Sequence, residues 1–370
     1  MNKIVLVTIV LLGCASCTKN NTNPSSSSTT TPPPSGSTWT TITSPLGSGS
    51  TQTINSACAV GSSIFIGTSK GVYVSSDNGN TWKATTNAIT SNVGATYASD
   101  TATECEVMSN GSNLYLTTEY LFGNGTTDNG LFQSSNNGNT WDTAWTGLGF
   151  QQPFFSYTPY SVYFNGSTII FPSGNYVYKS TSGGVSWATS ASVEPATSTN
   201  ANVGGNIVTD GTNFYIYDRD QISNAGVYKS TDNCATFSLL VNDTLSKYSL
   251  TNIVAMGSKI YIADRQNYAG IYVTADGGNT FKPVNNGLKD ILFGIGNYNI
   301  YGFITDGTNL FAGTTNAVFT SSNGGASWTQ LGANIPNSSS VNQISITTLL
   351  EANGYIFAMS STGNIYRIQK

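Results

Sequence analysis

The feature that most constrains the fold is an eight-residue segment that recurs six times on the pattern Ser-x-Asp-x-Gly-x-Thr-Trp. We name the copies octets one to six: SSDNGNTW (75–82), SSNNGNTW (134–141), STSGGVSW (180–187), STDNCATF (230–237), TADGGNTF (274–281) and SSNGGASW (321–328). Their terminal aromatic residues follow one another at intervals of 44 to 59 residues. A repeat of this length is typical of a propeller blade built from four short strands.

Two further columns of apolar residues recur with the octets and give the number of blades. Each unit opens with a short strand and a tight turn, and the strand after the turn carries a large apolar residue at one place: Phe65, Tyr115, Ile170, Tyr215, Tyr261, Phe311 and Phe357. The third strand carries another: Tyr73, Phe132, Tyr178, Tyr228, Tyr272, Phe319 and Tyr366. Both columns have seven members. The sequence therefore predicts an all-β fold, a seven-bladed β-propeller with four-stranded antiparallel blades.

The two ends of the repeat region supply the half-unit that six octets leave missing. The last unit runs through its third strand, 364–368, and lacks an octet, whereas 36–39 (GSTW) match the end of one. Residues 40–43 then continue as a fourth strand would. We expect this N-terminal strand to complete the C-terminal blade and close the ring, which leaves no mismatched sheet edge.

The octets resemble the Asp-box of the BNR/sialidase-type β-propeller repeat, and the resemblance extends over the whole folded region. It implies that the octets join third to fourth strands on the face away from the usual binding site. The Asp side chains suit a turn role, since they accept backbone N–H bonds there. We assign structural roles to the following octet residues: Asp77, Trp82, Asn136, Trp141, Trp187, Asp232, Asp276 and Trp328.

The first 36 residues predict export. A charged start and the apolar run 4–12 form a signal too short to span a bilayer. The following LLGCASC resembles a bacterial lipoprotein cleavage site, with Cys17 as the expected lipidated residue and Cys14 as the alternative. The predicted organisation is a signal peptide (1–16), a Ser/Thr/Pro-rich flexible tether (17–36) and the propeller (37–370), anchored to the cell envelope at the outer membrane.

Composition excludes several kinds of function. The net charge of −4 argues against nucleic-acid binding, which needs a basic surface. The chain has no histidine, so His-based catalysis is excluded and a transition-metal site is not expected. We expect no cofactor and no metal. Cys58, Cys105 and Cys234 can form at most one disulfide, and small buried side chains are the preferred interpretation.

The candidate binding residues lie in the loops that the resemblance places on the ligand face, between second and third strands and between blades. The long loops of the first kind are 118–130, 218–226 and 264–270, and the inter-blade link 147–160 is rich in aromatic residues. Guanidinium and aromatic groups beside carboxylates suit the recognition of carboxylates or sugar hydroxyls. The ligand-binding candidates are Glu119, Tyr120, Phe154, Phe155, Tyr157, Asp218, Arg219, Asp264 and Arg265. The alternative for the two Asp-Arg pairs is an intraloop salt bridge that shapes the turn.

The preferred function is a monomeric, lipid-anchored binding protein for a glycan or a protein partner, without catalytic residues. The alternative is a glycoside hydrolase, which requires two carboxylates about 5–10 Å apart. Its candidates are Glu119, Asp128, Asp218, Asp220 and Asp264, with Glu104 and Glu106 as weaker ones. The chain has only three arginines, too few for the carboxylate-binding triad of a sialidase together with other roles. An envelope assembly factor is a further alternative.

Overall fold

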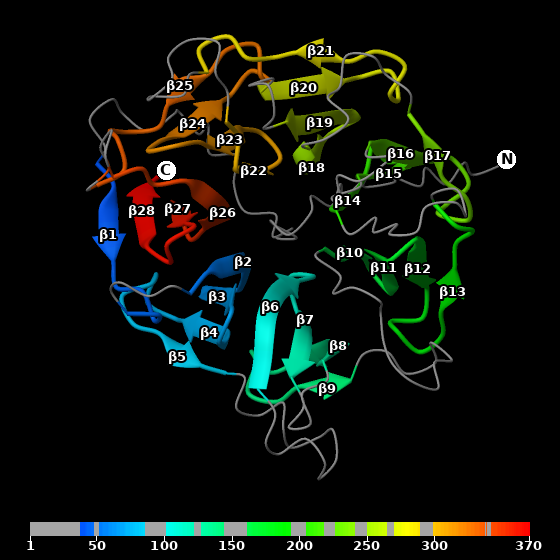
Figure 1. Cartoon of the computed structure of the whole chain (residues 1–370), viewed down its shortest axis with the longest axis horizontal. Coiled ribbons are helices and arrows are strands. Elements are labelled where there is room, and N and C mark those ends of the chain that lie inside the picture. Colours follow the sequence, from blue (N-terminus) through cyan, green and yellow to red (C-terminus); the bar gives the residue numbers. More distant parts are fainter. Residues whose placement is uncertain are drawn as a thin grey trace, which may run out of the picture.

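The computed structural model describes residues 38–47, 52–85, 101–121, 127–143, 161–193, 205–217, 226–240, 250–264, 270–288, 299–336, 338 and 342–370. Within these, only the backbone is described for 101–104, 118–121, 127–130, 143 and 264. The strands form seven four-stranded antiparallel sheets arranged in a ring, so the predicted seven-bladed propeller is confirmed (Figure 1). The predicted signal peptide and tether lie outside the described residues. No helix in the described part is long and apolar enough to cross a membrane.

Each blade runs from an innermost to an outermost strand in sequence order. Blade 1 contains β2 (Ile54–Val60), β3 (Ser63–Thr68), β4 (Gly71–Ser75) and β5 (Lys83–Ala84). Blade 2 contains β6 (Thr101–Ser109), β7 (Leu114–Leu121), β8 (Thr127–Ser134) and β9 (Asp142–Thr143). Blade 3 contains β10 (Tyr163–Asn165), β11 (Thr168–Ser173), β12 (Tyr176–Ser180) and β13 (Ala188–Thr189). Blade 4 contains β14 (Ile207–Thr209), β15 (Phe214–Tyr217), β16 (Val227–Ser230) and β17 (Ser238–Leu239).

The remaining three blades follow the same order. Blade 5 contains β18 (Leu250–Met256), β19 (Lys259–Asp264), β20 (Gly270–Thr274) and β21 (Lys282–Pro283). Blade 6 contains β22 (Gly302–Thr305), β23 (Leu310–Gly313), β24 (Val318–Ser321) and β25 (Thr329–Gln330). Blade 7 contains β26 (Ile346–Ala352), β27 (Tyr355–Ser360), β28 (Ile365–Gln369) and, as its outermost strand, β1 (Thr40–Ile42).

The ring closes as the sequence predicts. β1 pairs antiparallel with β28, with Thr40 opposite Arg367 and Ile42 opposite Ile365. Trp39, which ends the GSTW half-octet, is buried and donates its indole N–H to the carbonyl of Leu331 in blade 6 at 2.9 Å. Blade 7 is therefore built from both ends of the propeller sequence, and Figure 1 shows β1 beside β28 at the rim.

The core lies between blades because both faces of each sheet are apolar. Successive side chains of a strand point to opposite faces, so runs such as Phe214–Tyr217 present apolar groups to both neighbouring blades. Each of the seven hydrophobic clusters of described residues joins two adjacent blades. Between blades 5 and 6, for example, Tyr261 and Ile271 pack with Phe303 and Phe319. Full burial of one such side chain contributes about 1.5–3 kcal/mol.

One predicted loop is largely a hairpin. The sequence predicts a loop over 118–130, but β7 extends to Leu121 and β8 begins at Thr127, with Glu119 paired to Asn129 and Tyr120 to Asp128. The strands lengthen because each supplies the other with backbone partners, which a polar composition alone does not reveal. The prediction of a thirteen-residue loop is wrong, and only 122–126 lie outside the described residues at this place.

Candidate functional site

The blades present two chemically different faces. Since strands alternate in direction, the turns from first to second strand and the octets from third to fourth strand share one end of each blade, which we name the octet face. The turns from second to third strand and the links between blades share the other end, the loop face. The turns from second to third strand are short in four blades: 69–70 in blade 1, 174–175 in blade 3, 314–317 in blade 6 and 361–364 in blade 7.

The octet is a closed hydrogen-bonded turn around its acidic residue. In octet one, Asp77 Oδ1 accepts the Thr81 N–H at 2.9 Å and the Ser75 hydroxyl at 2.8 Å, while Oδ2 accepts the Thr81 hydroxyl at 2.7 Å. These hydrogen bonds, led by that of the Thr81 hydroxyl, lower the pKa of Asp77 to about 2. The pKa values of Asp232 and Asp276 are lowered to about 2 in the same way, by Thr236 and Thr280.

Octets without an aspartate keep this turn. Asn136 Oδ1 accepts the Thr140 N–H at 2.9 Å, Asn323 Oδ1 accepts the Ser327 N–H at 2.9 Å, and Ser182 Oγ accepts the Ser186 N–H at 2.9 Å. The fourth and fifth octet residues have positive φ, as at Gly79 (86°), and the fifth residue is glycine in every octet except the fourth. The interaction that recurs is therefore an accepted backbone N–H rather than a negative charge.

The octets also join neighbouring blades. In four octets, the residue at the fourth position accepts a hydrogen bond through its carbonyl from a side chain of the preceding blade. The donors and acceptors are Arg367 to Asn78, Lys179 to Asn233, Lys229 to Gly277, and Tyr261 to Gly324. The Trp328 indole donates to Val284 of the preceding blade at 2.7 Å, as Trp39 does to Leu331. Side chains on the octet face thus hold neighbouring blades together.

On the loop side, a ring of mostly polar residues occupies equivalent places at the innermost strands, within the strand in blades 1, 2, 5, 6 and 7 and just before it in blades 3 and 4. Its members are Ser56, Glu106, Ser161, Asn206, Asn252, Gly302 and Thr348. We name this set the inner ring. Several members bond to the inner strand of the next blade. Ser56 Oγ accepts the Val107 N–H at 2.6 Å, and Ser161 Oγ accepts the Ile207 N–H at 3.0 Å.

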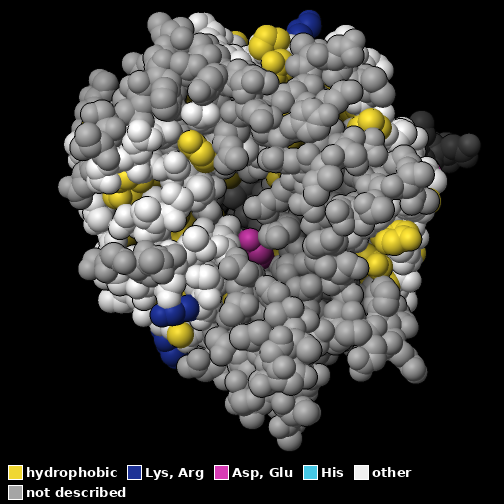
Figure 2. Space-filling view, in the orientation of Figure 1, with side chains coloured by type: hydrophobic (Ala, Val, Ile, Leu, Met, Phe, Trp, Pro, Cys, Tyr) yellow, Lys and Arg dark blue, Asp and Glu magenta, His cyan; other side chains and the backbone are white. Residues whose placement is uncertain are grey.

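The amides of the inner ring continue the same pattern. Asn206 donates to Asn252 Oδ1 at 2.6 Å, and Asn252 donates to the Phe303 carbonyl at 3.1 Å. Where the ring has Gly302, an added Cβ would lie 3.0 Å from the Thr347 carbonyl oxygen. Glu106 is the only ionisable member of the inner ring and is partly exposed. Figure 2 shows an opening at the centre of the molecule with acidic side-chain atoms at its rim.

A second set of equivalent residues ends the second strands at the loop face. Thr68, Ser360 and Asp264 share this register in blades 1, 7 and 5, since Thr68 pairs with Gly71 and Asp264 with Gly270. Thr68 Oγ1 accepts the Lys70 N–H at 3.0 Å, and Ser360 Oγ accepts the Asn364 N–H at 3.1 Å, so both hydroxyls stabilise the turn.

At the loop face of blade 6, the buried residue Asn316 holds the turn and the link to blade 7 together. Asn316 is 2% exposed, has φ of 65°, and lies in the turn between β23 and β24. Its side chain accepts the Ile344 N–H at 2.7 Å, while its backbone bonds to Ile344 and Ile335. This one residue therefore attaches the link between blades 6 and 7 to the turn. A left-handed conformation at a buried non-glycine residue persists only where its surroundings fix it.

The candidate binding residues are only partly described. Glu119 and Tyr120 lie in β7, where only the backbone is described. Asp264 ends β19. Phe154, Phe155, Tyr157, Asp218, Arg219 and Arg265 lie outside the described residues, as do Cys14 and Cys17. Their predicted roles stay predictions.

Arg367 belongs to the opposite face. Its guanidinium donates to the Asn78 carbonyl in octet one and lies 5.3 Å from the centre of the Tyr355 ring. Because the chain has three arginines, only Arg219 and Arg265 remain for an anionic ligand at the loop face. A three-arginine carboxylate site of the sialidase kind is therefore excluded.

The described cysteines and acids offer no evident reactive centre. Cys58, Cys105 and Cys234 are buried thiols, and burial raises the pKa of Cys234 to about 12. Among the described residues no group of three His, Cys, Asp or Glu side chains could hold a metal ion. Sequence reasoning named Glu106 but missed the inner ring, whose only signal is a polar residue near the start of each first strand.

No protein-family model matches the sequence, and no protein of curated function matches it either. Among solved structures, the extracellular domain of a putative hybrid two-component system from B. thetaiotaomicron superposes with a TM-score of 0.58 at 15% identity. That match covers 90% of this chain, which spans 39% of that domain. A catalytically inactive virginiamycin B lyase from Staphylococcus aureus matches with a TM-score of 0.54 at 10% identity, over 90% of this chain and 99% of the lyase. At these identities the comparisons show a shared propeller fold.

Proposed function

We propose that the protein is an exported binding protein, tethered to the cell envelope by a lipidated Cys17 or Cys14, whose loop face holds a glycan or a protein partner. The supporting observation is the different use of the two faces. On the octet face, side chains such as Arg367, Lys179 and Lys229 bond to neighbouring blades. The loop face instead carries loops of unequal length around a mostly polar inner ring, with Arg219, Arg265 and the aromatic link 147–160 in those loops.

The localisation rests on the export signal and the Ser/Thr/Pro-rich tether. The structural match to an extracellular domain is consistent with a role outside the cytoplasm. Radiolabelled palmitate incorporation tests the anchor: Cys17→Ala abolishes labelling if Cys17 carries the lipid, and Cys14→Ala does so if the alternative holds. Labelling that survives both substitutions together would refute the anchor.

A glycan array and an envelope-protein pull-down with residues 37–370 test binding directly. We expect a ligand whose binding is lost in the Phe154→Ala/Phe155→Ala variant and kept in Val185→Ser. Val185 is the matched control because it is 71% exposed on the octet face. Binding that is lost in both variants, or in neither, would contradict a ligand site at the aromatic link. Co-purification of an unfinished envelope complex would instead favour the assembly factor.

Hydrolysis is the second candidate, favoured only by the carboxylate of Glu106 in the inner ring. A glycosidase would need a second acid about 5–10 Å away. The candidates are Asp218, which follows β15 of blade 4 in the sequence, and Asp264, which ends β19 of blade 5. Release of reducing sugar by the wild type, lost in Glu106→Gln and Asp218→Asn but kept in Asp142→Asn on the outer strand β9, would establish the enzyme. Binding without turnover favours the binding protein.

A further inference from the structure

Blade 7 differs from the others in how it is held in the ring. The chain passes directly from each of blades 1 to 6 into the next blade, whereas blade 7 is connected to blade 1 through β1 alone. β1 has three residues, and its sheet neighbour is β28. If β1 leaves β28, no covalent connection holds β26–β28 against blade 1. The apolar cluster between blades 7 and 1 and the polar contacts across the same junction must then keep the ring closed.

Polar contacts from β26–β28 to blade 1 are concentrated on the octet face. Arg367 of β28 donates to the Asn78 carbonyl, and its guanidinium lies over the Tyr355 ring. Asn353, in the turn between β26 and β27, donates to the Ser62 carbonyl at 2.9 Å and to Asn78 Oδ1 at 2.8 Å. None of these bonds involves β1.

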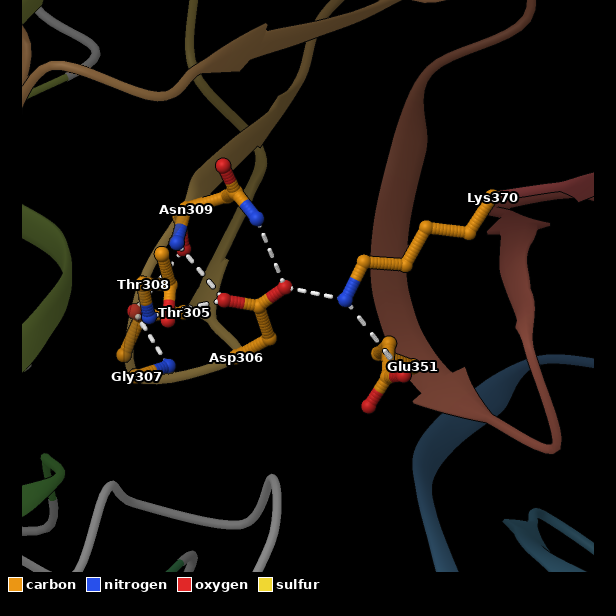
Figure 3. A network of polar contacts seen from close by, with 7 residues as sticks. All are labelled: Thr305, Asp306, Gly307, Thr308, Asn309, Glu351 and Lys370. Carbon is orange, nitrogen blue, oxygen red and sulfur yellow. Dashed lines mark hydrogen bonds and ion pairs between the residues drawn. The ribbon is translucent and has the colours of Figure 1, made fainter. Parts of the chain in front are cut away.

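A second set of contacts holds β28 against blade 6. The Lys370 ammonium contacts the Asp306 carboxylate and lies 3.6 Å from Glu351 Oε1 of β26 (Figure 3). Asp306 is itself fixed by the N–H groups of Thr308 and Asn309. The Asp306 side chain is 3% exposed and that of Glu351 is 10% exposed, so this ion pair is shielded from solvent.

The geometry of β28 explains why one strand reaches both neighbours. Lys370 directly follows β28, and its N–H bonds to the Gly354 carbonyl at 2.9 Å, so the chain stays extended beside blade 7 there. Arg367 and Lys370 are three positions apart, and side chains at odd separations in an extended chain leave opposite faces. One face of blade 7 meets blade 1 and the other meets blade 6. Arg367 of β28 and Lys370 directly after it therefore place one cation against each neighbouring blade, independently of the pairing of β28 with β1.

We propose that Arg367, Asn353 and Lys370, with their partners Asn78, Asp306 and Glu351, form a polar lock that acts with the apolar cluster between blades 7 and 1 to keep the ring closed when β1 detaches. β1 is then an exchangeable outer strand, and its departure exposes the edge of β28 without opening the propeller. The strand that follows the N-terminal segment can in this way move separately from the ring that presents the loop face.

Hydrogen–deuterium exchange of the full chain, read on peptides from β1 and from β26–β28, tests the lock. Trp39 directly precedes β1 and anchors it, because its buried indole donates to the Leu331 carbonyl. Trp39→Ala removes this anchor. We expect exchange in β1 to accelerate by roughly tenfold or more, while exchange in β26–β28 stays within about twofold of wild type. Joint acceleration of both regions in Trp39→Ala would overturn the proposal, because the ring would then depend on β1.

The complementary variant is Arg367→Met/Lys370→Met, which removes both cations of the lock. In combination with Trp39→Ala, it should make β26–β28 exchange faster than they do in Trp39→Ala alone. Lys179→Met/Lys229→Met is the matched control, since these lysines make the same bonds to octet carbonyls at junctions that the chain itself crosses. With Trp39→Ala, this control should leave β26–β28 protected. Equal exchange of β26–β28 in the two combinations would overturn the lock. If the triple variant does not fold, the Trp39→Ala comparison decides by itself.

Discussion

The hydroxyl of Tyr215 donates to Oδ2 of Asp210 at 2.7 Å, and both residues belong to blade 4. The turn sequence TDGTN recurs in blade 6 at 305–309, but there the residue equivalent to Tyr215 is Phe311. Asp306 takes its partner from blade 7 instead, where Lys370 contacts the same Oδ2 oxygen. In both blades burial raises the carboxyl pKa, but the hydrogen bonds outweigh burial and the net pKa is lowered.

This equivalence predicts a rescue. Lys370→Met should lower the free energy of unfolding by about 1–3 kcal/mol, because it leaves a buried carboxylate without its cation. Adding Phe311→Tyr gives Asp306 a tyrosine hydroxyl like the one that Tyr215 donates to Asp210, and should restore part of the lost free energy of unfolding. Urea unfolding of the wild type, both single variants and the double variant measures the coupling. Additive effects of the two substitutions would show that the tyrosine does not reach Asp306.

The octet turn should tolerate asparagine and reject alanine at its third position. Asp77→Asn keeps an oxygen for the Thr81 N–H, as Asn136 does for Thr140 at 2.9 Å, and should leave the Tm almost unchanged. Asp77→Ala removes the acceptor for Ser75 and for both Thr81 donors and should lower the Tm by several degrees. Thermal unfolding by circular dichroism distinguishes the two. Equal losses would indicate that the charge, rather than the turn bond, stabilises the octet.

The octet carboxylates should contribute to acid sensitivity. The pKa values of Asp77, Asp232 and Asp276 are about 2 in the folded protein, and an unfolded aspartate titrates near 3.9. A depressed folded pKa gives stability that is present above the unfolded value and is lost as the pH falls through the folded value. The Tm should therefore fall between about pH 4 and pH 2, and less steeply in Asp77→Asn/Asp232→Asn/Asp276→Asn. An unchanged slope in that variant would contradict this origin.

Octet four has a cysteine where the other octets have glycine, and the preceding blade accommodates it. Cys234 has φ of 69° and is 4% exposed. Ser190 of blade 3 and Leu240 of blade 4 are equivalent residues that directly follow the outermost strands of their blades. The Ser190 N–H bonds to the Val177 carbonyl, and the Leu240 N–H bonds to the Val227 carbonyl. A Cβ on Gly278 would lie 2.6 Å from Leu240 Cδ1, so space decides which octet can hold a side chain.

Gly278→Cys should therefore lower the free energy of unfolding by about 2–4 kcal/mol, through steric overlap with Leu240 and left-handed strain. Leu240→Ser should lower the free energy of unfolding less in the Gly278→Cys variant than in the wild type. The coupling free energy between the two substitutions should be about 0.5 kcal/mol or more. Chemical denaturation of the four proteins closes the cycle. A coupling of zero would mean that the size of the facing residue does not limit the fifth octet position.

The sequence predicted features that depend on local chemistry and on counting. Octet spacing and the two aromatic columns gave seven blades, and the GSTW segment at 36–39 placed the closing strand against β28. The loop predicted over 118–130 failed because β7 and β8 extend by pairing with each other, and polar side chains on both strands gave no sign of it. The loop residues proposed to bind a ligand follow from the family resemblance and the composition of the loops, and the binding experiments test them.

What the sequence by itself determined is the repeat: which residues turn, which strands follow, and where the ring closes. These depend on contacts within a few residues, such as those between Asp77 and Thr81. Only the tertiary structure decided which residues meet across blades, such as Arg367 with Asn78 and Lys370 with Asp306. Those partners are fixed by the register and angle at which seven sheets pack. The hydrophobic pattern and the turns set the register within one blade, but the side chains that meet across blades also depend on how two twisted sheets pack, which no local pattern encodes.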